Sequence, residues 1–213
     1  LPESLDLLMP IGARDLTVDE AIQDADRDPP RRVWRVVPRT ERAWAPSWVV
    51  GQLVHLALEH WLFPDDRERD FYAWAAAEAR SYGLTDEGQV GDAVRRTAKM
   101  MNRFRDTSLH DEMASARRCL HEVGYAVTNA DGVPESGAID ALFQDDHGWT
   151  LVEFKTDYAE DRSALEALLE REDYVEQVRR YLVAAEPLLG ERPRPVLCFL
   201  NVRRRAHQIR DRW

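Results

Sequence analysis

Apolar side chains follow a helical spacing through residues 47–117, after a lead-in that shows little periodicity. Residues 1–46 are rich in Asp, Arg and Pro, which predicts an extended lead-in or linker with one short helix near 18–25. The segment 48–62 is apolar on almost every side, which predicts a buried helix with Ser47 as its N-cap. Three more helices are predicted in this helical block, over 66–82, 86–105 and 111–117.

The pattern changes at residue 118 to short runs rich in β-branched and aromatic residues. Turn-forming groups of Asn, Asp and Gly separate three such runs, which predicts a meander of three strands. A long helical stretch follows, and an apolar run between prolines then predicts a buried strand before a last edge strand. The expected strands are 118–128, 135–143, 149–156, 194–201 and 203–209, and the expected helix is 161–188. The order β-β-β-α-β predicts an α/β fold with a mixed central sheet.

The composition is that of a globular protein with room for one large domain or two small ones. The chain has 213 residues, of which 44% are hydrophobic and 32% are charged. Neither a transmembrane helix nor a signal peptide is predicted, because long apolar windows and a basic leading run are both missing. The chain begins with Leu1 rather than Met, which favours a piece of a longer protein. Cys119 and Cys198 lie in apolar runs and are expected to be thiols in a reducing compartment, so we expect a cytoplasmic protein.

The charge is acidic overall but unevenly distributed. A net charge of −10 argues against non-specific affinity for nucleic acid. Residues 31–42 nevertheless carry five arginines against one acid, and residues 192–213 carry seven arginines against one acid. The arginines within 31–42 and 203–212 are therefore candidate contacts for DNA phosphates, although such a run is more often a solvated face. We expect this chain alone to bind DNA weakly.

Two neighbouring predicted strands carry acidic side chains in apolar surroundings. Asp140 lies inside an apolar run, while Glu153 and Lys155 are two residues apart on the next strand and so share one face. Burying such carboxylates is costly unless they are paired or bind a metal, and oxygen ligands suit Mg²⁺ or Mn²⁺. A lysine beside them can hold an attacking water or offset charge on a phosphate, which indicates metal-assisted hydrolysis of a phosphodiester. The alternative is an ordinary ion pair between the lysine and one of the acids that bridges the sheet.

The motifs on these two strands resemble a known family. The run GAIDAL at 137–142, followed by EFK at 153–155, resembles the PD-(D/E)XK nuclease superfamily, with Ile139 in the place of the Pro. The predicted element order is similar to the restriction-endonuclease-like core of that superfamily. The longer run EFKTD at 153–157 resembles the nuclease domains of RecB- and AddA-type modules of UvrD-like helicase–nucleases.

This resemblance implies a role for each matched residue. The implied catalytic residues are Asp140, Glu153 and Lys155. The same two acids are implied to bind the metal, together with the backbone carbonyl of Phe154. The lysine is implied to orient or help deprotonate the nucleophile.

Three further features, two motifs and one single position, match the helicase-associated subfamily. Gly51 and His55 resemble its G-x-x-x-H motif, which implies that His55 is an additional metal ligand. Gln177 and Tyr181 resemble its Q-x-x-x-Y motif, and their spacing places them on one side of a helix, where they are implied to shape the site and contact substrate. Glu122 resembles the subfamily's acidic position on the first strand, which implies that it also helps to shape the site. Each feature also has an ordinary explanation when taken singly. His55 fits a core histidine, Gln177 and Tyr181 fit an amphipathic helix with the tyrosine half buried, and Glu122 fits a solvated strand residue.

The implied function is a divalent-metal-dependent DNA nuclease that leaves 5′-phosphate and 3′-hydroxyl ends, using Mg²⁺ or Mn²⁺. Residues 47–213 would form the nuclease domain, and a helicase partner would deliver single-stranded DNA to it during double-strand break repair and recombination. Two cysteines cannot hold a four-cysteine iron–sulfur cluster, and no Walker A pattern is present, so neither a cluster nor a bound nucleotide is expected. The alternatives are a freestanding or CRISPR-associated exonuclease, a catalytically dead nuclease fold that acts as a DNA-binding scaffold, and an unrelated mixed α/β binding protein.

Overall fold

The computed structural model divides the chain into two compact units, Leu1–Ala43 and Trp44–Trp213. The residues that it describes are 8–10, 34–36, 43–65, 70–128, 132 and 134–213. Among these residues, no helix is both long and apolar enough to cross a membrane.

The first unit is described only over two short strands. β1 (Leu8–Pro10) pairs antiparallel with β2 (Trp34–Val36). The short helix predicted near 18–25 lies outside the described residues, as do the arginines predicted within 31–42 as phosphate contacts, apart from Arg35 in β2. The prediction of an extended lead-in over 1–46 stays a prediction.

The second unit begins with four helices, whose bounds are α2 (Ser47–Glu59), α3 (Phe71–Ser81), α4 (Glu87–Arg105) and α5 (Ser108–Ala114). Side chains of Asp70, Asp86 and Thr107 accept a hydrogen bond from the third following residue and so begin α3, α4 and α5. The Thr107 cap makes α5 begin three residues before the predicted start at 111. The prediction of Ser47 as N-cap is wrong, because Pro46 occupies that position and α2 has no side-chain cap.

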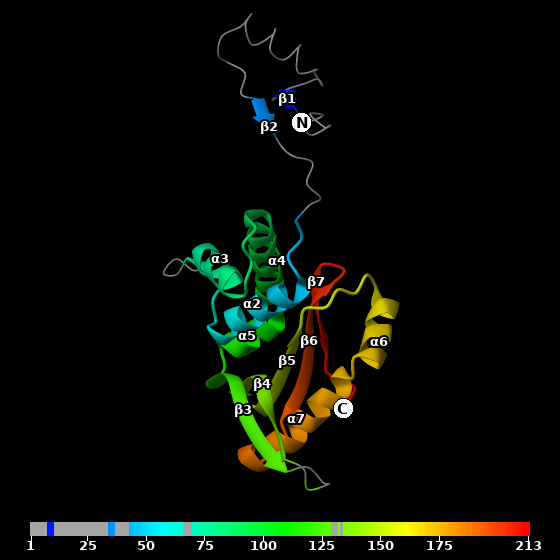
Figure 1. Cartoon of the computed structure of the whole chain (residues 1–213). Coiled ribbons are helices and arrows are strands. Elements are labelled where there is room, and N and C mark those ends of the chain that lie inside the picture. The colour runs from blue at the N-terminus through cyan, green and yellow to red at the C-terminus, as the bar shows by residue number, and fades with distance from the viewer. Residues whose placement is uncertain (1–7, 11–33, 37–42, 66–69, 129–131, 133) are drawn as a thin grey trace, which may run out of the picture. The chain divides into compact units, whose positions relative to one another are not determined.

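The remainder of the unit is one mixed sheet, and its order in space is β3-β4-β5-β6-β7 (Figure 1). The strands are β3 (Arg118–Thr128), β4 (Pro134–Asp145), β5 (Gly148–Lys155), β6 (Arg194–Val202) and β7 (Arg205–Ile209). β5 and β6 pair parallel, and the other neighbours pair antiparallel. The predicted fold class, a mixed sheet behind a helical block, is confirmed.

The connection between β5 and β6 differs from the prediction in one respect. A single helix was expected over 161–188, but the chain forms α6 (Arg162–Arg171) and α7 (Tyr174–Leu189). The break falls at Asp173, whose φ of 58° is incompatible with a continuous right-handed helix. α7 therefore begins anew and is free to follow its own direction over the sheet.

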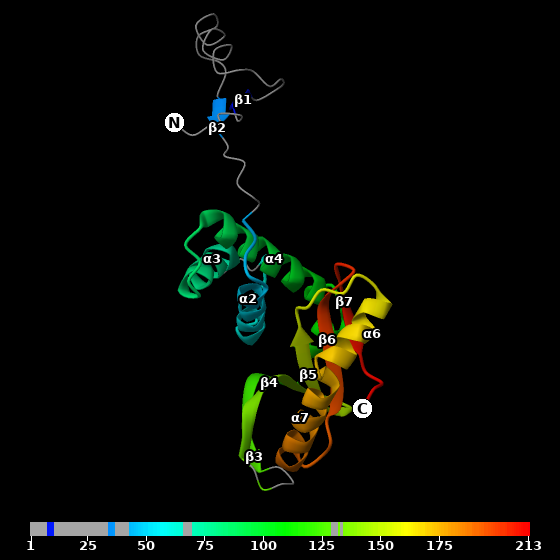
Figure 2. The same ribbon diagram turned by 45° about the vertical axis from the view of Figure 1, so that its right-hand side comes forward.

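Two apolar cores lie on opposite faces of the sheet. On one face, residues of α2, α3, α4 and α5 pack with Phe143 of β4 and Phe154 of β5. On the other face, α6 and α7 pack with Leu151 of β5 and Phe199 of β6. Figure 2 shows α6 and α7 together beside β6, away from the helical block. Because side chains alternate along β5, this arrangement directs Glu153 and Lys155 toward the face that α7 covers.

A close approach of α2 to the end of β5 sets the position of the first core relative to the strands. A Cβ added at Gly51 would lie 3.3 Å from the hydroxyl oxygen of Thr156, which is a tight contact, so the absence of a side chain at residue 51 favours this close approach. His55 lies one turn further along α2, on the same side of the helix as Gly51. The glycine thus brings the histidine over the strands.

Candidate active site

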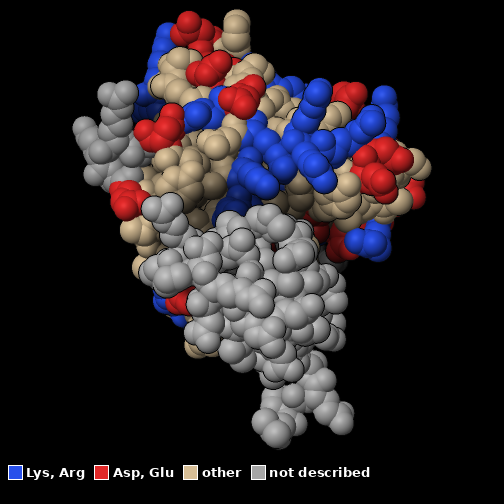
Figure 3. All heavy atoms as spheres, turned by 90° about the horizontal axis from the view of Figure 1, so that it is seen from above, with Lys and Arg blue, Asp and Glu red and all other residues tan. Residues whose placement is uncertain are grey.

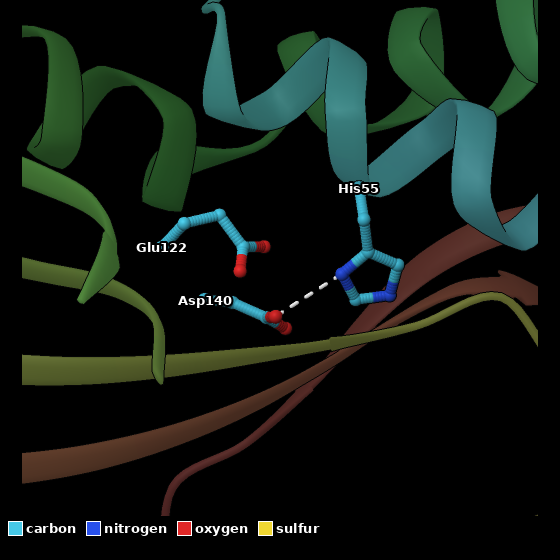
Figure 4. Close-up of side chains that lie close together, drawn as sticks. All are labelled: His55, Glu122 and Asp140. Carbon is cyan, nitrogen blue, oxygen red and sulfur yellow. Dashed lines mark hydrogen bonds and ion pairs between the residues drawn. The ribbon is translucent and has the colours of Figure 1, made fainter. Parts of the chain in front are cut away.

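Three side chains from three different elements converge, as Figure 4 shows, and we call them the ligand cluster: His55 of α2, Glu122 of β3 and Asp140 of β4. One ligand atom from each of them lies within 4.8 Å of the others. His55 Nδ1 is 3.1 Å from Asp140 Oδ1. The strand register explains why Glu122 lies near Asp140. His121 pairs with Ala141 and Val123 pairs with Ile139, so Glu122 lies opposite Asp140 between these two pairs.

The Asp140 carboxylate is held from both sides. While Oδ1 contacts the histidine, Oδ2 accepts a hydrogen bond of 2.6 Å from the backbone N–H of Phe154. The pairing of β4 with β5 ends at Ala141 and Val152, so beyond this point the strands are joined through the Asp140 side chain. This fixes the carboxylate at the place where β4 leaves β5. The predicted role of the Phe154 carbonyl as a ligand stays a prediction.

Glu122 reaches the ligand cluster through an unusual backbone conformation. Its φ is 48°, in the left-handed region, which costs a residue with a side chain about 1–2 kcal/mol. Burial and the charge of Asp140 raise the pKa of Glu122, although His55 acts in the opposite direction. Strain and repulsion at the same residue are typical of a functional position.

A second group of side chains extends from β5 to α7, and we call it the lysine chain: Glu153, Lys155, Gln177 and Tyr181. Lys155 Nζ donates to Glu153 Oε1 at 2.7 Å and to Gln177 Oε1 at 2.8 Å. Gln177 Nε2 then donates to the Tyr181 hydroxyl at 2.7 Å. The two residues of the predicted Q-x-x-x-Y motif thus lie on one side of α7, where Gln177 contacts the lysine and Tyr181 contacts Gln177.

Tyr174, at the start of α7, adds two contacts to the lysine chain. Its ring centroid is 4.4 Å from Lys155 Nζ, which is within the range of a cation–π interaction. Its hydroxyl donates to Asp157 Oδ2 at 2.8 Å. Tyr174 is not among the site residues predicted from the sequence, and its spacing of three from Gln177 is the signal that points to it.

Glu153 connects the two groups. Its side chain is only 3% exposed, and Oε2 has no hydrogen-bond partner among the described residues. Burial and the nearby Asp140 carboxylate raise the pKa of Glu153, while Lys155 opposes the shift. The three-residue ligand cluster does not include Glu153, so its predicted metal contact stays a prediction.

The pKa of His55 reflects the same surplus of negative charge. Burial by itself would lower it, but the hydrogen bond and charge of Asp140, aided by Glu153, outweigh burial and raise the pKa of His55. Three carboxylates thus share a small region with one imidazole and one ammonium group.

This donor set fits a divalent cation. Two of the three donors are carboxylate oxygens, which suit Mg²⁺ and Mn²⁺, and the third is an imidazole nitrogen, which suits a transition-metal ion. The buried Oε2 of Glu153 lacks any other partner in the part of the chain that the structure describes. A bound cation would also remove the repulsion that raises the pKa values of Glu122 and Glu153. The arrangement can therefore hold a metal next to a positioned lysine.

Comparisons with known proteins add a family match. The family model of the PD-(D/E)XK nuclease superfamily matches residues 31–210. Among solved structures, the crystal structure of protein VC1899 from Vibrio cholerae matches with 12% sequence identity and a TM-score of 0.33. That match covers 81% of this chain and 55% of the other, so the chain spans little more than half the length of the Vibrio cholerae protein. The comparison with curated proteins gave no match.

Proposed function

The chain belongs to the PD-(D/E)XK nuclease superfamily, and we propose that it is a divalent-metal-dependent deoxyribonuclease whose active site comprises the ligand cluster and the lysine chain. The observation that carries the proposal is the convergence of His55, Glu122 and Asp140 within 4.8 Å of one another, beside a buried carboxylate and a lysine. A fold kept only as a scaffold would have no need of this costly concentration of charge.

The ligand cluster would hold the metal through His55, Asp140 and Glu122, and Glu153 has a spare oxygen beside them. When bound, such a metal acidifies a water and stabilises charge on the phosphate. Asp140 is the best fixed of these ligands, because its carboxylate also accepts the Phe154 amide.

Lys155 would act on the reacting groups directly. An ammonium has three N–H donors, and the contacts with Glu153 and Gln177 use two of them. The third is then available to hold the attacking water or to donate to a phosphate oxygen. Gln177 is a positioning residue in this scheme, since it acts through the lysine, and Tyr181 in turn holds Gln177.

The finer assignment rests on motifs. The spacing of Gly51 with His55 and of Gln177 with Tyr181 supports a module of a UvrD-like helicase–nuclease that acts on single-stranded DNA in double-strand break repair. The close approach of α2 to Thr156 at Gly51 and the hydrogen bond between Gln177 and Lys155 give each motif a physical purpose. We propose residues 47–213 as the nuclease domain of that module.

Cleavage of end-labelled single-stranded DNA tests the proposed function. The chain is incubated with Mn²⁺, with Mg²⁺ or with a chelator, and Asp140→Asn is run beside Asp146→Asn, a matched change at an exposed aspartate. We expect metal-dependent cleavage by the parent and by Asp146→Asn, and a loss of at least about a hundredfold in Asp140→Asn. Equal cleavage by the two variants would contradict the site.

A further inference from the structure

A pocket of about 360 Å³ opens directly beside the ligand cluster. His55 lines it, together with Trp48 and Gly51 of α2, Arg96 of α4, Tyr158 after β5 and Asn201 of β6. A volume of this size accepts a small flat group such as an unstacked nucleobase, whereas a base-paired helix cannot enter it. Whatever occupies the pocket therefore lies in reach of the residue proposed to bind metal.

Two aromatic side chains at this pocket are unusually exposed. Trp48 is 59% exposed and Tyr158 is 58% exposed, although both residue types normally bury most of their surface. The Trp48 and Tyr82 rings pack in a T-shaped pair, with centroids 6.1 Å apart at 82°, which holds the Trp48 ring while more than half of the residue stays exposed. Open aromatic faces beside a pocket are the feature on which nucleic-acid bases stack in single-strand binding proteins.

A row of cations leads from the pocket along α4. Arg96, Lys99 and Arg103 are spaced by three and four residues, so they lie along one side of the helix. Arg96 is engaged by the Ala45 carbonyl and the Ser47 hydroxyl. Lys99 is exposed, and Arg103 donates to Asn201 Oδ1 at 2.6 Å, which connects the row to the pocket lining.

The turn between β6 and β7 adds two more arginines to this row. Val202 pairs with Arg205, so Arg203 and Arg204 form the tip of the hairpin, and their φ values are 49° and 62°. Such a turn normally takes Asn and Gly, so two exposed arginines there are unfavourable for the backbone alone. Arg103 donates to the Leu200 carbonyl and to Asn201 Oδ1 at the end of β6, so the turn that follows lies close to α4. Figure 3 shows Lys and Arg side chains gathered on this face, and we call Lys99, Arg103, Arg203 and Arg204 the cationic rim.

We propose that the pocket and the cationic rim form the binding track for the unpaired strand of the DNA substrate: Trp48 and Tyr158 stack on its bases, and the cationic rim contacts its phosphates. This inference rests on the proposed function, since the track ends at the ligand cluster. With an acidic net charge of −10, a local row of cations offers a polyanion a favourable approach to the described surface. Asp157 also lines the pocket, and because it repels phosphate we place a base rather than the backbone at that end.

Binding without cleavage tests the track. A fluorescein-labelled oligothymidylate is titrated with the whole chain in EDTA, and fluorescence anisotropy reports the dissociation constant. We expect Trp48→Ala and Tyr158→Ala each to weaken binding by about tenfold. Tyr72→Ala, which removes a similarly exposed tyrosine at 52% exposure on α3, is expected to bind like the parent. Trp48→Phe keeps a ring for stacking and should retain most of the affinity, which separates stacking from folding.

The salt dependence tests the cationic rim. For a single strand, log K falls as log salt rises, and each lost phosphate contact makes this negative slope shallower by about 0.7. We expect this change in Arg204→Gln. Arg192→Gln, whose arginine pairs with Glu186 elsewhere on the surface, should leave the slope unchanged.

The possible outcomes separate this inference from the proposed function. Binding that depends on Trp48 and Tyr158 in a chain that never cleaves DNA would support the track and contradict the nuclease. Metal-dependent cleavage by the parent, with normal binding by both alanine variants, would overturn the track and leave the nuclease standing. The track would also be wrong if the parent bound no oligothymidylate, or if a duplex bound with the same dependence on the two aromatic residues.

Discussion

The ligand cluster and the lysine chain lie side by side, yet they balance their charges in opposite ways. In the ligand cluster, Glu122 and Asp140 face each other with one histidine, one backbone angle is strained, and the pKa of Glu122 is raised. In the lysine chain, each side chain has a hydrogen-bond partner at 2.7 to 2.8 Å, and the buried Glu153 Oε2 is left without a partner among the described residues. The ligand cluster lacks a cation that would balance its carboxylates, whereas the lysine chain already contains the Lys155 ammonium.

The difference indicates a division of labour. Repelling carboxylates held in place by the fold gain most from binding a metal, because the ion replaces the repulsion with attraction. A hydrogen-bonded lysine gains nothing from the ion, but it is positioned before the substrate arrives and needs no reorganisation during the reaction. The substitutions below should therefore affect metal binding and cleavage differently in the two groups.

The largest expected contrast is between Asp140→Asn and Lys155→Ala. Both should reduce cleavage by at least about a hundredfold, since one removes a ligand and the other removes the cation next to the phosphate. Only Asp140→Asn should abolish the stabilisation by metal, which for the parent reaches about 2.7 kcal/mol when Mn²⁺ is present at 100 times its dissociation constant. Thermal unfolding with and without Mn²⁺ measures this stabilisation in the parent and in each variant. Loss of the metal effect in both variants would remove the distinction between the groups.

The sequence predicted the order of the elements well, because Gly, Asn and Asp turns separate the strands and the hydrophobic spacing changes at residue 118. It could not predict the break between α6 and α7, since Asp173 takes a left-handed φ without being a glycine. Nor could local spacing predict the cap of α2, where Ser47 accepts a hydrogen bond from Arg96, 49 residues away, instead of capping the helix.

The candidate site shows a similar limit. The motifs named the residues, but the position of Glu122 within the ligand cluster depends on the β3–β4 register and on its own φ of 48°. The register could be approximated from the sequence, because the turn predicted at residues 129–132 places residue 122 nearly opposite residue 140. The contact between Lys155 and Gln177 could not be predicted, because it depends on where α7 begins after Asp173. The catalytic and ligand roles themselves stay predictions.

A smaller effect is expected from Glu122→Gln. The change keeps the shape of the side chain and removes one charge, so the ligand cluster should lose about tenfold in Mn²⁺ affinity while Asp140 still binds. Calorimetric titration measures the affinity. Glu186→Gln, at an exposed glutamate that pairs with Arg192, is the matched control. An unchanged affinity would return Glu122 to the site-shaping role that the motif implied.

Gln177 should affect the lysine chain without affecting metal binding. Gln177→Leu removes the acceptor for Lys155, and we expect kcat to fall by about tenfold while KM and Mn²⁺ affinity stay near the parent values. Gln177→Glu restores an oxygen acceptor and should recover much of the loss. If both variants fall equally, the residue supports α7 structurally and does not position the lysine.

The smallest expected effect comes from the close approach of α2 to the end of β5, which positions His55. Gly51→Ala gains helix propensity of about 1 kcal/mol, but its new Cβ would lie 3.3 Å from Thr156 Oγ1, and we expect α2 to relieve this tight contact by a small shift away from β5. The gain and the contact should nearly cancel in stability, whereas Mn²⁺ affinity should fall a few-fold because His55 moves with the helix. Removing the hydroxyl with Thr156→Ala should let the double variant recover both the affinity and the propensity gain. Additive effects in this double-mutant cycle would mean that the close approach does not set the position of the histidine.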